Sequence, residues 1–315
     1  MSLYDKRPQQ APEQGTDLAS TSARVESKNV QTDLDLQRVP VEEVSIQPLS
    51  RLVFHTDPRG RGADRFRFLR MRLRELSNAR KVKRLLITSA LPQDGKSTIA
   101  LNLATALAER GTRAVLLLEA DLHQASLSQQ LGLKARPGLA ECLEGGLDPM
   151  SALRRIEPLS WYFLPAGEPH SNATELLQSE ALSGIMDALS PRFDWILVDS
   201  PPVNLLTDAL SFKKQTDASL LVARAGRTPV EAVEEAIGLL GRDHVFSIVL
   251  NGAEGLDRLY SKYYGNYGYY GRDAAKDAEP AKRSDGSAAR LANVDRSASM
   301  ALVKDGLSPK VAVDG

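Results

Sequence analysis

A nine-residue stretch, ALPQDGKST at 90–98, constrains the fold most because it joins two segments of different periodicity. The segment before it, RLLITS at 84–89, is nearly all apolar, which is typical of a strand that is buried on both faces. The segment after it repeats apolar residues at helical spacing, and Gly111 suits the C-terminus of such a helix. The sequence therefore predicts a strand, a tight turn and a helix over about 96–110.

The same alternation of apolar runs and helical stretches extends through the middle of the chain. Runs that are apolar throughout predict strands covered on both sides, and helices between them predict parallel neighbours. We therefore predict an α/β fold with a mostly parallel sheet and helices on both faces. The predicted strands are residues 84–89, 114–119, 161–166, 195–200, 219–224 and 246–251.

Composition places this chain among ordinary soluble proteins. Of the 315 residues, 42% are hydrophobic, and 40 Lys and Arg balance 40 Asp and Glu. Balanced charge gives no indication of nucleic acid, so no nucleic-acid partner is expected. The single cysteine, Cys142, excludes an internal disulfide and fits a reducing compartment. No apolar run reaches the roughly 18–20 residues that span a bilayer, so a cytoplasmic protein is expected.

Both ends of the chain differ in composition from the middle. Residues 1–50 are rich in Gln, Ser, Asp, Pro and Thr, and we expect a disordered tail there. Residues 272–315 have a similar composition and are expected to form a second disordered tail. Between the tails we expect one domain over 51–258, followed by a cluster at 259–271 that carries six of the eight tyrosines.

The turn at 90–98 matches the P-loop pattern (A/G)-x4-G-K-(S/T). Gly95 allows backbone N–H groups to converge on a phosphate, Lys96 can reach the β- and γ-phosphates, and the Ser97 hydroxyl can bind Mg2+. The positive end of the following helix adds to the attraction. A chance GKS in a loop is the alternative, but the flanking strand and helix favour a nucleotide site. The predicted nucleotide-binding residues are Gln93, Asp94, Gly95, Lys96, Ser97 and Thr98.

Polar side chains follow three of the predicted strands. In WILVDSPP, Asp199 comes after four apolar residues in a Walker B arrangement and could hold Mg2+ or, alternatively, cap a turn. In AVLLLEADLH, Glu119 and Asp121 occupy alternate positions, where one could assist Mg2+ and the other accept a proton. A solvated acidic loop is the alternative for this pair. Asn251 ends the last predicted strand, where it could read adenine or form an NG turn.

The order of these motifs resembles the bacterial tyrosine kinases of capsule and exopolysaccharide synthesis. Members combine a P-loop, a second acidic motif of the form D-x-D-x-R after an apolar strand, a Walker B motif ending in D-(S/T)-P-P, and a C-terminal tyrosine cluster. The corresponding segments here are DGKST, LLLEADLH, ILVDSPP and YSKYYGNYGYYG, and the resemblance covers about 51–271. Two positions depart from the pattern, since Glu119 replaces the first aspartate and His123 replaces the arginine.

The resemblance implies a P-loop NTPase fold and an autokinase that uses ATP and Mg2+. Lys96 and the P-loop amides would hold the phosphates, and Ser97 and Asp199 would hold Mg2+ with help from Asp121. Glu119 or Asp121 would activate the incoming tyrosine hydroxyl, and the motif leaves open which of the two does so. The implied catalytic residues are Lys96, Glu119, Asp121 and Asp199.

In this family the C-terminal tyrosines are the phosphate acceptors, and they react between neighbouring subunits. Glycines are interleaved with the tyrosines here, which keeps such a segment out of helix and strand. A sticky Tyr/Gly tail without phosphorylation is the alternative. The implied acceptors are Tyr260, Tyr263, Tyr264, Tyr267, Tyr269 and Tyr270.

The segment DRFRFLRMRLREL at 64–76 predicts an amphipathic helix with arginines on one face. Asp64, Arg67 and Arg70 resemble the family's E-x-x-R-x-x-R segment, which lies at the subunit interface of a ring. A solvated basic face and attraction to anionic lipid are the alternatives.

The resemblance also implies partners and a place in the cell. The partners are a membrane-embedded polysaccharide co-polymerase that determines chain length, a cognate tyrosine phosphatase, and further copies of the chain in a ring. The kinase would lie at the inner membrane through its partner and would control chain length or export. Two rival functions stay open: a partitioning or positioning ATPase, which usually has a lysine where this chain has Leu91, and a nucleotide-binding adaptor without catalysis.

Overall fold

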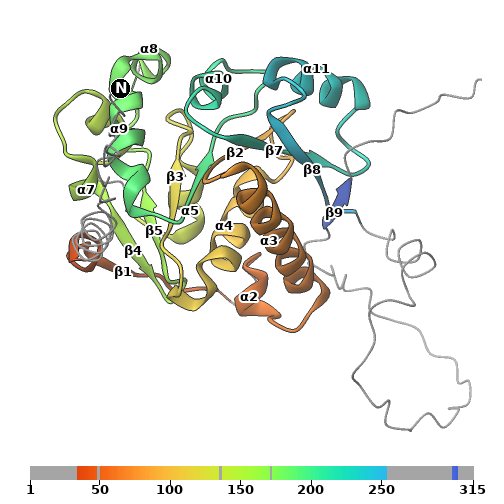
Figure 1. Cartoon of the computed structure of the whole chain (residues 1–315), viewed down its shortest axis with the longest axis horizontal. Coiled ribbons are helices and arrows are strands. Elements are labelled where there is room, and N and C mark those ends of the chain that lie inside the picture. The colour runs from red at the N-terminus through yellow and green to blue at the C-terminus, as the bar shows by residue number, and fades with distance from the viewer. Residues whose placement is uncertain (1–33, 48–49, 135–136, 171, 254–299, 304–315) are drawn as a thin grey trace, which may run out of the picture. The chain divides into compact units, whose positions relative to one another are not determined.

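The computed structural model describes residues 34–47, 50–134, 137–170, 172–253 and 300–303 (Figure 1). The chain divides into two compact units, residues 1–39 and 40–315. In the first unit the described residues begin with a helical turn at 34–37, and Val39 N–H donates to Leu36 O at 3.3 Å. The strands and helices below belong to the second unit. Among the described residues, no helix combines the length and the apolarity needed to cross a membrane.

The second unit is built on a single sheet, which over the described residues has nine strands in the order β1-β4-β5-β3-β6-β2-β7-β8-β9. Neighbouring strands run parallel except in the β4–β5 and β8–β9 pairs, which are antiparallel. The six predicted strands are all present, and the mostly parallel α/β fold is confirmed. The strands are β1 Val41–Glu43, β2 Arg84–Ser89, β3 Val115–Glu119, β4 Arg154–Glu157, β5 Trp161–Leu164, β6 Trp195–Asp199, β7 Ala218–Arg224, β8 Val245–Asn251 and β9 Met300–Val303.

Helices cover both faces of this sheet (Figure 1). On one face α4 packs against β2, β3 and β6, and α3 packs on α4; on the other face α10 and α11 pack against β2 and β7. Short 3-10 turns follow α4 at Glu109–Gly111 and α9 at Ser190–Arg192. The α-helices are α2 Val53–Thr56, α3 Arg61–Arg80, α4 Lys96–Ala108, α5 Ser126–Leu131, α6 Leu139–Leu143, α7 Pro149–Ala152, α8 Ala173–Gln178, α9 Glu180–Leu189, α10 Asp208–Lys213 and α11 Val230–Leu240.

The buried core follows from the alternation of side chains along each strand. In β2, Leu85 and Ile87 belong to the same buried cluster as Phe66 and Leu69 of α3. Leu86, between them, is also fully buried, and the alternation places it on the opposite face of the sheet. Burial on both faces explains why these strands are apolar at nearly every position rather than at every second one.

Two segments that the sequence placed in disordered tails are strands in the structure. Residues 41–43, within the predicted 1–50 tail, form β1 and pair in parallel with β4. Residues 300–303, within the predicted 272–315 tail, form β9 beside β8. Both strands are too short to show a periodicity, and each forms its hydrogen bonds along one edge of the sheet. Composition alone therefore could not predict them. The predicted tyrosine cluster at 259–271 lies outside the described residues.

The order of the strands brings the candidate site together. β6 lies between β2 and β3, so the connection from β2 to β3 passes over it. The connection from β6 to β7 passes over β2 in the opposite direction. In α/β sheets, such a reversal opens a crevice at the carboxyl ends of the strands. Asp199 at the end of β6 lies beside Ile87 of β2 and beside Glu119 of β3 in the sheet register.

Candidate active site

The turn after β2 is shaped by Gly95, the residue that precedes α4. Its φ angle is 97°, in the left-handed region that residues with a side chain rarely adopt. A Cβ atom there would lie 2.0 Å from Nδ2 of Asn251, and this Nδ2 donates to Asp94 O at 2.8 Å. Glycine is therefore required both by the backbone and by the contact with β8. The turn leads directly into the N-terminus of α4, where anions bind well.

Asp94 and Gln93 belong to this turn and are held by residues at the end of β7 and just after it. Asp94 is buried, and its carboxylate accepts from Leu91 N–H at 3.1 Å and from a hydroxyl at 2.7 Å. Burial raises the pKa of the Asp94 carboxyl group, against the effect of these hydrogen bonds. The backbone and side-chain oxygens of Gln93 each accept from an arginine. Sequence reasoning does not find the three partners, because they lie 131 to 134 positions away: Arg224, Arg227 and Thr228.

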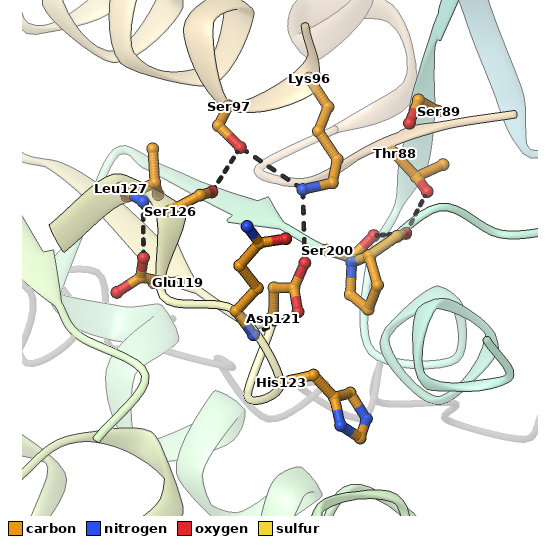
Figure 2. A network of polar contacts seen from close by, with 12 residues as sticks. Thr88, Ser89, Lys96, Ser97, Glu119, Asp121, His123, Ser126, Leu127 and Ser200 are labelled. Carbon is orange, nitrogen blue, oxygen red and sulfur yellow. Dashed lines mark hydrogen bonds and ion pairs between the residues drawn. The ribbon is translucent and has the colours of Figure 1, made fainter. Parts of the chain in front are cut away.

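Lys96 extends from the first turn of α4 into the centre of the site (Figure 2). Its Nζ lies 3.4 Å from Asp121 Oδ2 and 3.4 Å from Ser97 Oγ. Ser97 Oγ in turn lies 2.9 Å from Ser126 Oγ, whereas Thr98 is buried within α4. The structure thus brings together three of the predicted site residues, Lys96, Ser97 and Asp121.

Asp199 lies at the carboxyl end of β6 and is completely buried. Among the residues that the structure describes, neither of its carboxylate oxygens has a hydrogen-bond partner. Burial raises the pKa of Asp199 to about 6, although the charge of Lys96 and the nearby Ser97 hydroxyl oppose this rise. A buried carboxylate without a partner is costly, so this position suits a ligand that supplies positive charge.

Mg2+ is the cation that these side chains fit. Ser97 supplies a hydroxyl, and Asp121 and Asp199 supply carboxylates, which are the hard oxygen donors that Mg2+ takes. The described part of the chain contains no preformed group of three or more His, Cys, Asp or Glu side chains that could hold a metal ion. Such a group is not needed, because Mg2+ is usually bound by one or two carboxylates together with phosphate oxygens and water.

Glu119 is not part of this arrangement. Its side chain is fully buried and lies beside Leu127, away from Lys96 (Figure 2). Oε1 accepts from Leu127 N–H at 2.7 Å and from Ser128 N–H at 3.0 Å, and Oε2 accepts from Ser128 Oγ at 2.6 Å and from Ala166 N–H at 3.2 Å. An ionised carboxylate has about four acceptor positions, so all of them are used here. The predicted role of Glu119 as a proton acceptor has no support in this geometry.

His123 also points away from the P-loop (Figure 2). Its Nε2 lies 3.0 Å from Oδ2 of Asp208, a fully buried carboxylate at the start of α10. The other oxygen of Asp208 accepts from Thr174 Oγ1 of α8 at 3.0 Å. His123 therefore links the loop after β3 to Asp208 of α10, and Asp208 in turn links to α8. Sequence reasoning finds neither Asp208 nor Thr174, since neither stands in a motif.

The residues predicted for a subunit interface make contacts within the chain. Arg67 pairs with Asp64 at 2.7 Å and donates to Pro58 O at 2.6 Å, and Arg70 donates to Ala106 O at 3.1 Å. The side chains of Arg67 and Asp64 still expose 41% and 67% of their surface. Their contact with another subunit stays a prediction, as does phosphorylation of the six tyrosines, which lie outside the described residues.

The family model described as "ParA: NUBPL iron-transfer P-loop NTPase" matches residues 81–248. This range includes the turn after β2, the loop after β3 and the end of β6. The chain therefore belongs to this class of P-loop NTPases.

Individual relatives narrow the class. The chain is 29% identical over 218 residues to tyrosine-protein kinase YwqD of Bacillus subtilis (strain 168), covering 69% of this chain and 89% of YwqD. It is 30% identical over 242 residues to succinoglycan biosynthesis transport protein ExoP of Rhizobium meliloti (strain 1021), covering 71% of this chain and 30% of ExoP. This chain thus spans less than a third of the length of some of its curated relatives.

A solved structure agrees with these relatives. The crystal structure of the chimerical protein CapA2B2 has a TM-score of 0.57 at 25% identity, covering 69% of this chain and 92% of CapA2B2. Within the P-loop NTPases, the chain is thus similar to proteins that include a named bacterial tyrosine kinase.

Proposed function

We propose that this chain is an ATP- and Mg2+-dependent protein-tyrosine kinase that phosphorylates the C-terminal tyrosines of other copies of itself. The observation that carries the proposal is the buried carboxylate of Asp199, which has no hydrogen-bond partner among the described residues and lies within the field of Lys96. A cation bound with a nucleotide would supply the missing partner. The name of YwqD, a tyrosine-protein kinase, supports the class of reaction.

ATP is the phosphate donor that this site fits. Backbone N–H groups around Gly95 and at the start of α4 suit the β- and γ-phosphates, and Lys96 extends from the same turn. Ser97 and Asp199 would hold Mg2+ directly, and Asp121 would assist only through a water of the ion, which leaves its carboxylate basic. When bound, Mg2+ neutralises phosphate charge during transfer. Asn251 is the proposed contact for adenine, because its amide lies beside Gly95 at the same edge of the sheet.

Asp121 is the proposed proton acceptor. Gln124 N–H donates to its Oδ1 at 3.0 Å, which fixes the side chain, and its Oδ2 faces Lys96. Once Lys96 bonds to phosphate oxygens, Oδ2 is free to take the proton of an incoming tyrosine hydroxyl. The tyrosine oxygen forms a bond to the γ-phosphorus, the bond from that phosphorus to the bridging oxygen of the β-phosphate breaks, and ADP leaves.

The proposed acceptors are the six tyrosines at 260–270. Strand β8, the last described element before them, ends at Asn251 beside Gly95, which is the edge of the sheet where the phosphate site lies. Each added phosphate brings roughly −1.5 to −2 charges, so phosphorylation would weaken or rearrange contacts between copies. The proposed contact with the next copy in a ring is made by Asp64, Arg67 and Arg70 of α3.

The proposed biological role is control of exopolysaccharide synthesis, in keeping with the likeness to ExoP, which is named for succinoglycan biosynthesis and transport. We propose that a membrane-embedded polysaccharide co-polymerase holds the chain at the inner membrane and activates it, and that a cognate tyrosine phosphatase reverses its modification. The kinase would then set the chain length or the export of the polymer.

Mass spectrometry of the purified protein after incubation with ATP and Mg2+ tests the reaction. Phosphate is expected on the tyrosines at 260–270 of the parent protein and none on Lys96→Ala. Lys134→Ala, which changes an exposed lysine outside the site, is the matched control and should be phosphorylated like the parent. A parent protein that stays unmodified even with the cytoplasmic segment of its co-polymerase present would contradict the proposal.

A positioning ATPase is the second candidate, since the family model that the chain matches is described as a P-loop NTPase, in terms of nucleotide hydrolysis rather than of tyrosine phosphorylation. Leu91 argues against it, because this position usually carries an additional lysine in such ATPases. ATP hydrolysis without phosphotyrosine would favour the ATPase, and nucleotide binding without turnover would favour an adaptor.

A further inference from the structure

The N-terminus of α5 has no cap of its own. Ala125, the residue before the helix, offers no side-chain acceptor to the first N–H groups. A helix leaves these N–H groups without partners inside the helix, and Ser, Thr, Asp or Asn at the capping position normally accepts from them. The acceptor for α5 must therefore come from another part of the chain.

Glu119 of β3 supplies this acceptor. Its Oε1 accepts from Leu127 and Ser128, the second and third residues of α5, which are the amides that a capping side chain would bind. Its Oε2 accepts from Ser128 Oγ and from Ala166 N–H in the loop after β5. A carboxylate also interacts favourably with the positive end of the helix dipole. One buried side chain thus joins β3, α5 and the loop after β5.

The capped turn brings a hydroxyl against the candidate magnesium site. Ser126, the first residue of α5, has its Oγ 2.9 Å from Ser97 Oγ (Figure 2). A hydrogen bond from a neighbouring side chain can orient a metal ligand, and its loss typically lowers metal affinity about 10–100-fold. The contact between the two serines depends on the position of the first turn of α5, which Glu119 fixes.

We propose that Glu119 is a positioning residue, which caps α5 from β3 and thereby holds Ser126 against Ser97. Glutamate is one methylene longer than the aspartate of the related kinase pattern, and this length is used to reach the amides of α5. The inference rests on the proposed function only in its last step, the orientation of the magnesium ligand. The cap itself can be tested in the protein without nucleotide.

Amide hydrogen exchange of the nucleotide-free protein tests the cap. In Glu119→Gln one acceptor oxygen becomes an NH2 group and the other loses its charge, so the hydrogen bonds from the amides of Leu127, Ser128 and Ala166 are lost or weakened. These amides should exchange about fivefold faster or more, which is the factor that corresponds to the loss of a helix cap. Unchanged exchange at these amides would overturn the proposal, whatever the kinase activity of the variant.

Two further variants make this measurement specific. Ala125→Ser provides an acceptor at the ordinary capping position, so Glu119→Gln combined with Ala125→Ser should regain protection at the first turn of α5. Glu231→Gln makes the same chemical change in the first turn of α11, at an exposed position, and should leave the amides of α5 as they are in the parent. Failure of Ala125→Ser to restore protection would overturn the assignment of Glu119 as the cap.

Binding of ADP at increasing Mg2+ concentration tests the link to Ser97. Glu119→Gln and Ser126→Ala should each raise the Mg2+ concentration for half-maximal binding about tenfold or more, and Ala125→Ser should reverse the effect of the first. Ser126→Ala should do so without faster exchange in α5, which separates the orientation of Ser97 from the stability of the helix. An unchanged Mg2+ requirement in Ser126→Ala would overturn this step.

A direct chemical role for Glu119 gives a different pattern. If Glu119 took the proton of tyrosine, Glu119→Gln would lose phosphotransfer while exchange in α5 and the Mg2+ requirement stayed normal, and Ala125→Ser would restore nothing. That result would overturn the proposal. A parent protein that forms no phosphotyrosine, with both shifts present in Glu119→Gln, would contradict the proposed function and uphold the positioning role.

Discussion

Lys96 Nζ and Asp121 Oδ2 lie 3.4 Å apart, and the two side chains expose only 13% and 8% of their surface. They reach each other from two elements, since Lys96 begins α4 and Asp121 follows β3. Two nearly buried charges depend on each other, because removing one partner leaves the other charge uncompensated. A phosphate group that draws Lys96 away would therefore leave Asp121 Oδ2 without its ion-pair partner. In this way nucleotide binding is linked to proton acceptance.

Asp121→Asn is expected to remove the proton acceptor and to leave ATP binding in place. Asparagine has nearly the same size but no basicity, so phosphotyrosine formation should fall about 10²–10⁴-fold, the usual contribution of a positioned general base. Transfer of radiolabelled phosphate measures the rate, and Asp243→Asn, at an exposed position, is the control. A loss of ATP affinity large enough to explain the whole decrease would contradict the assignment of Asp121.

Asp199→Asn is expected to stabilise the nucleotide-free protein at neutral pH. Burial raises the pKa of Asp199 from 3.8 to about 6, so its ionisation opposes folding. Well below pH 4 the carboxyl group is protonated in the folded and unfolded states alike, and no penalty arises. As the pH rises to about 6 the unfolded chain ionises first, and the penalty grows to on the order of 3 kcal/mol.

Urea unfolding at several pH values checks this expectation for Asp199. The variant should gain unfolding free energy over the parent through the window from about pH 4 to 6, and the gain should then stay constant. An advantage that shrinks as the pH rises would show that the charged carboxylate is not destabilising. Addition of Mg2+ and ADP should stabilise the parent more than the variant, because the ion needs the ionised side chain.

Gly95→Ala is expected to abolish nucleotide binding. Its new methyl group would lie 2.0 Å from Asn251 Nδ2, on a backbone with a φ of 97°. Gly132→Ala is the matched control, because Gly132 also has a positive φ, 68°, but a Cβ there would meet nothing within 4 Å. The control should lose about 1 kcal/mol of stability and keep its affinity for ADP. Titration calorimetry that finds the same ADP affinity in both variants would rule out the role given to Gly95.

His123 and Asp208 are expected to be coupled energetically. The buried Asp208 carboxylate would lose one of its hydrogen bonds in His123→Ala, and a buried acceptor without its partner is costly. A double-mutant cycle with His123→Ala and Asp208→Asn, measured as unfolding free energies, should give a coupling of about 1 kcal/mol. Effects that add within about 0.3–0.5 kcal/mol would mean that the two residues act independently.

The sequence predicts those parts of the fold and site that one local pattern determines. The turn around Gly95 follows from a strand, a loop and a helix in succession, and Asp199 follows from an apolar run that ends in a carboxylate. Strand β4, with the sequence RRIE, has only one buried residue, so it forms no apolar run and escapes prediction. Its place depends on β1 and β5 on either side of it.

Other parts of the site depend on which elements become neighbours. Thr228 reaches Asp94 because β7 pairs with β2, and the order of strands in a sheet is not a local property of the sequence. Glu119 stands at the end of a strand as Asp199 does, yet the two carboxylates have different environments. Ala125 has no side-chain acceptor that could cap α5. The first amides of α5 therefore donate to Glu119, whereas no amide donates to the carboxylate of Asp199 among the described residues.

Phosphate transfer between two variants decides whether this chain is a kinase that acts on its own copies. One variant carries Lys96→Ala and keeps its tyrosines, and the other has an intact site but phenylalanine at all six tyrosines of the cluster. With ATP and Mg2+, mass spectrometry should find phosphate on the tyrosines of the Lys96→Ala chain in the mixture and in neither variant alone. A mixture without phosphotyrosine, although the second variant binds ATP, would contradict the proposed kinase.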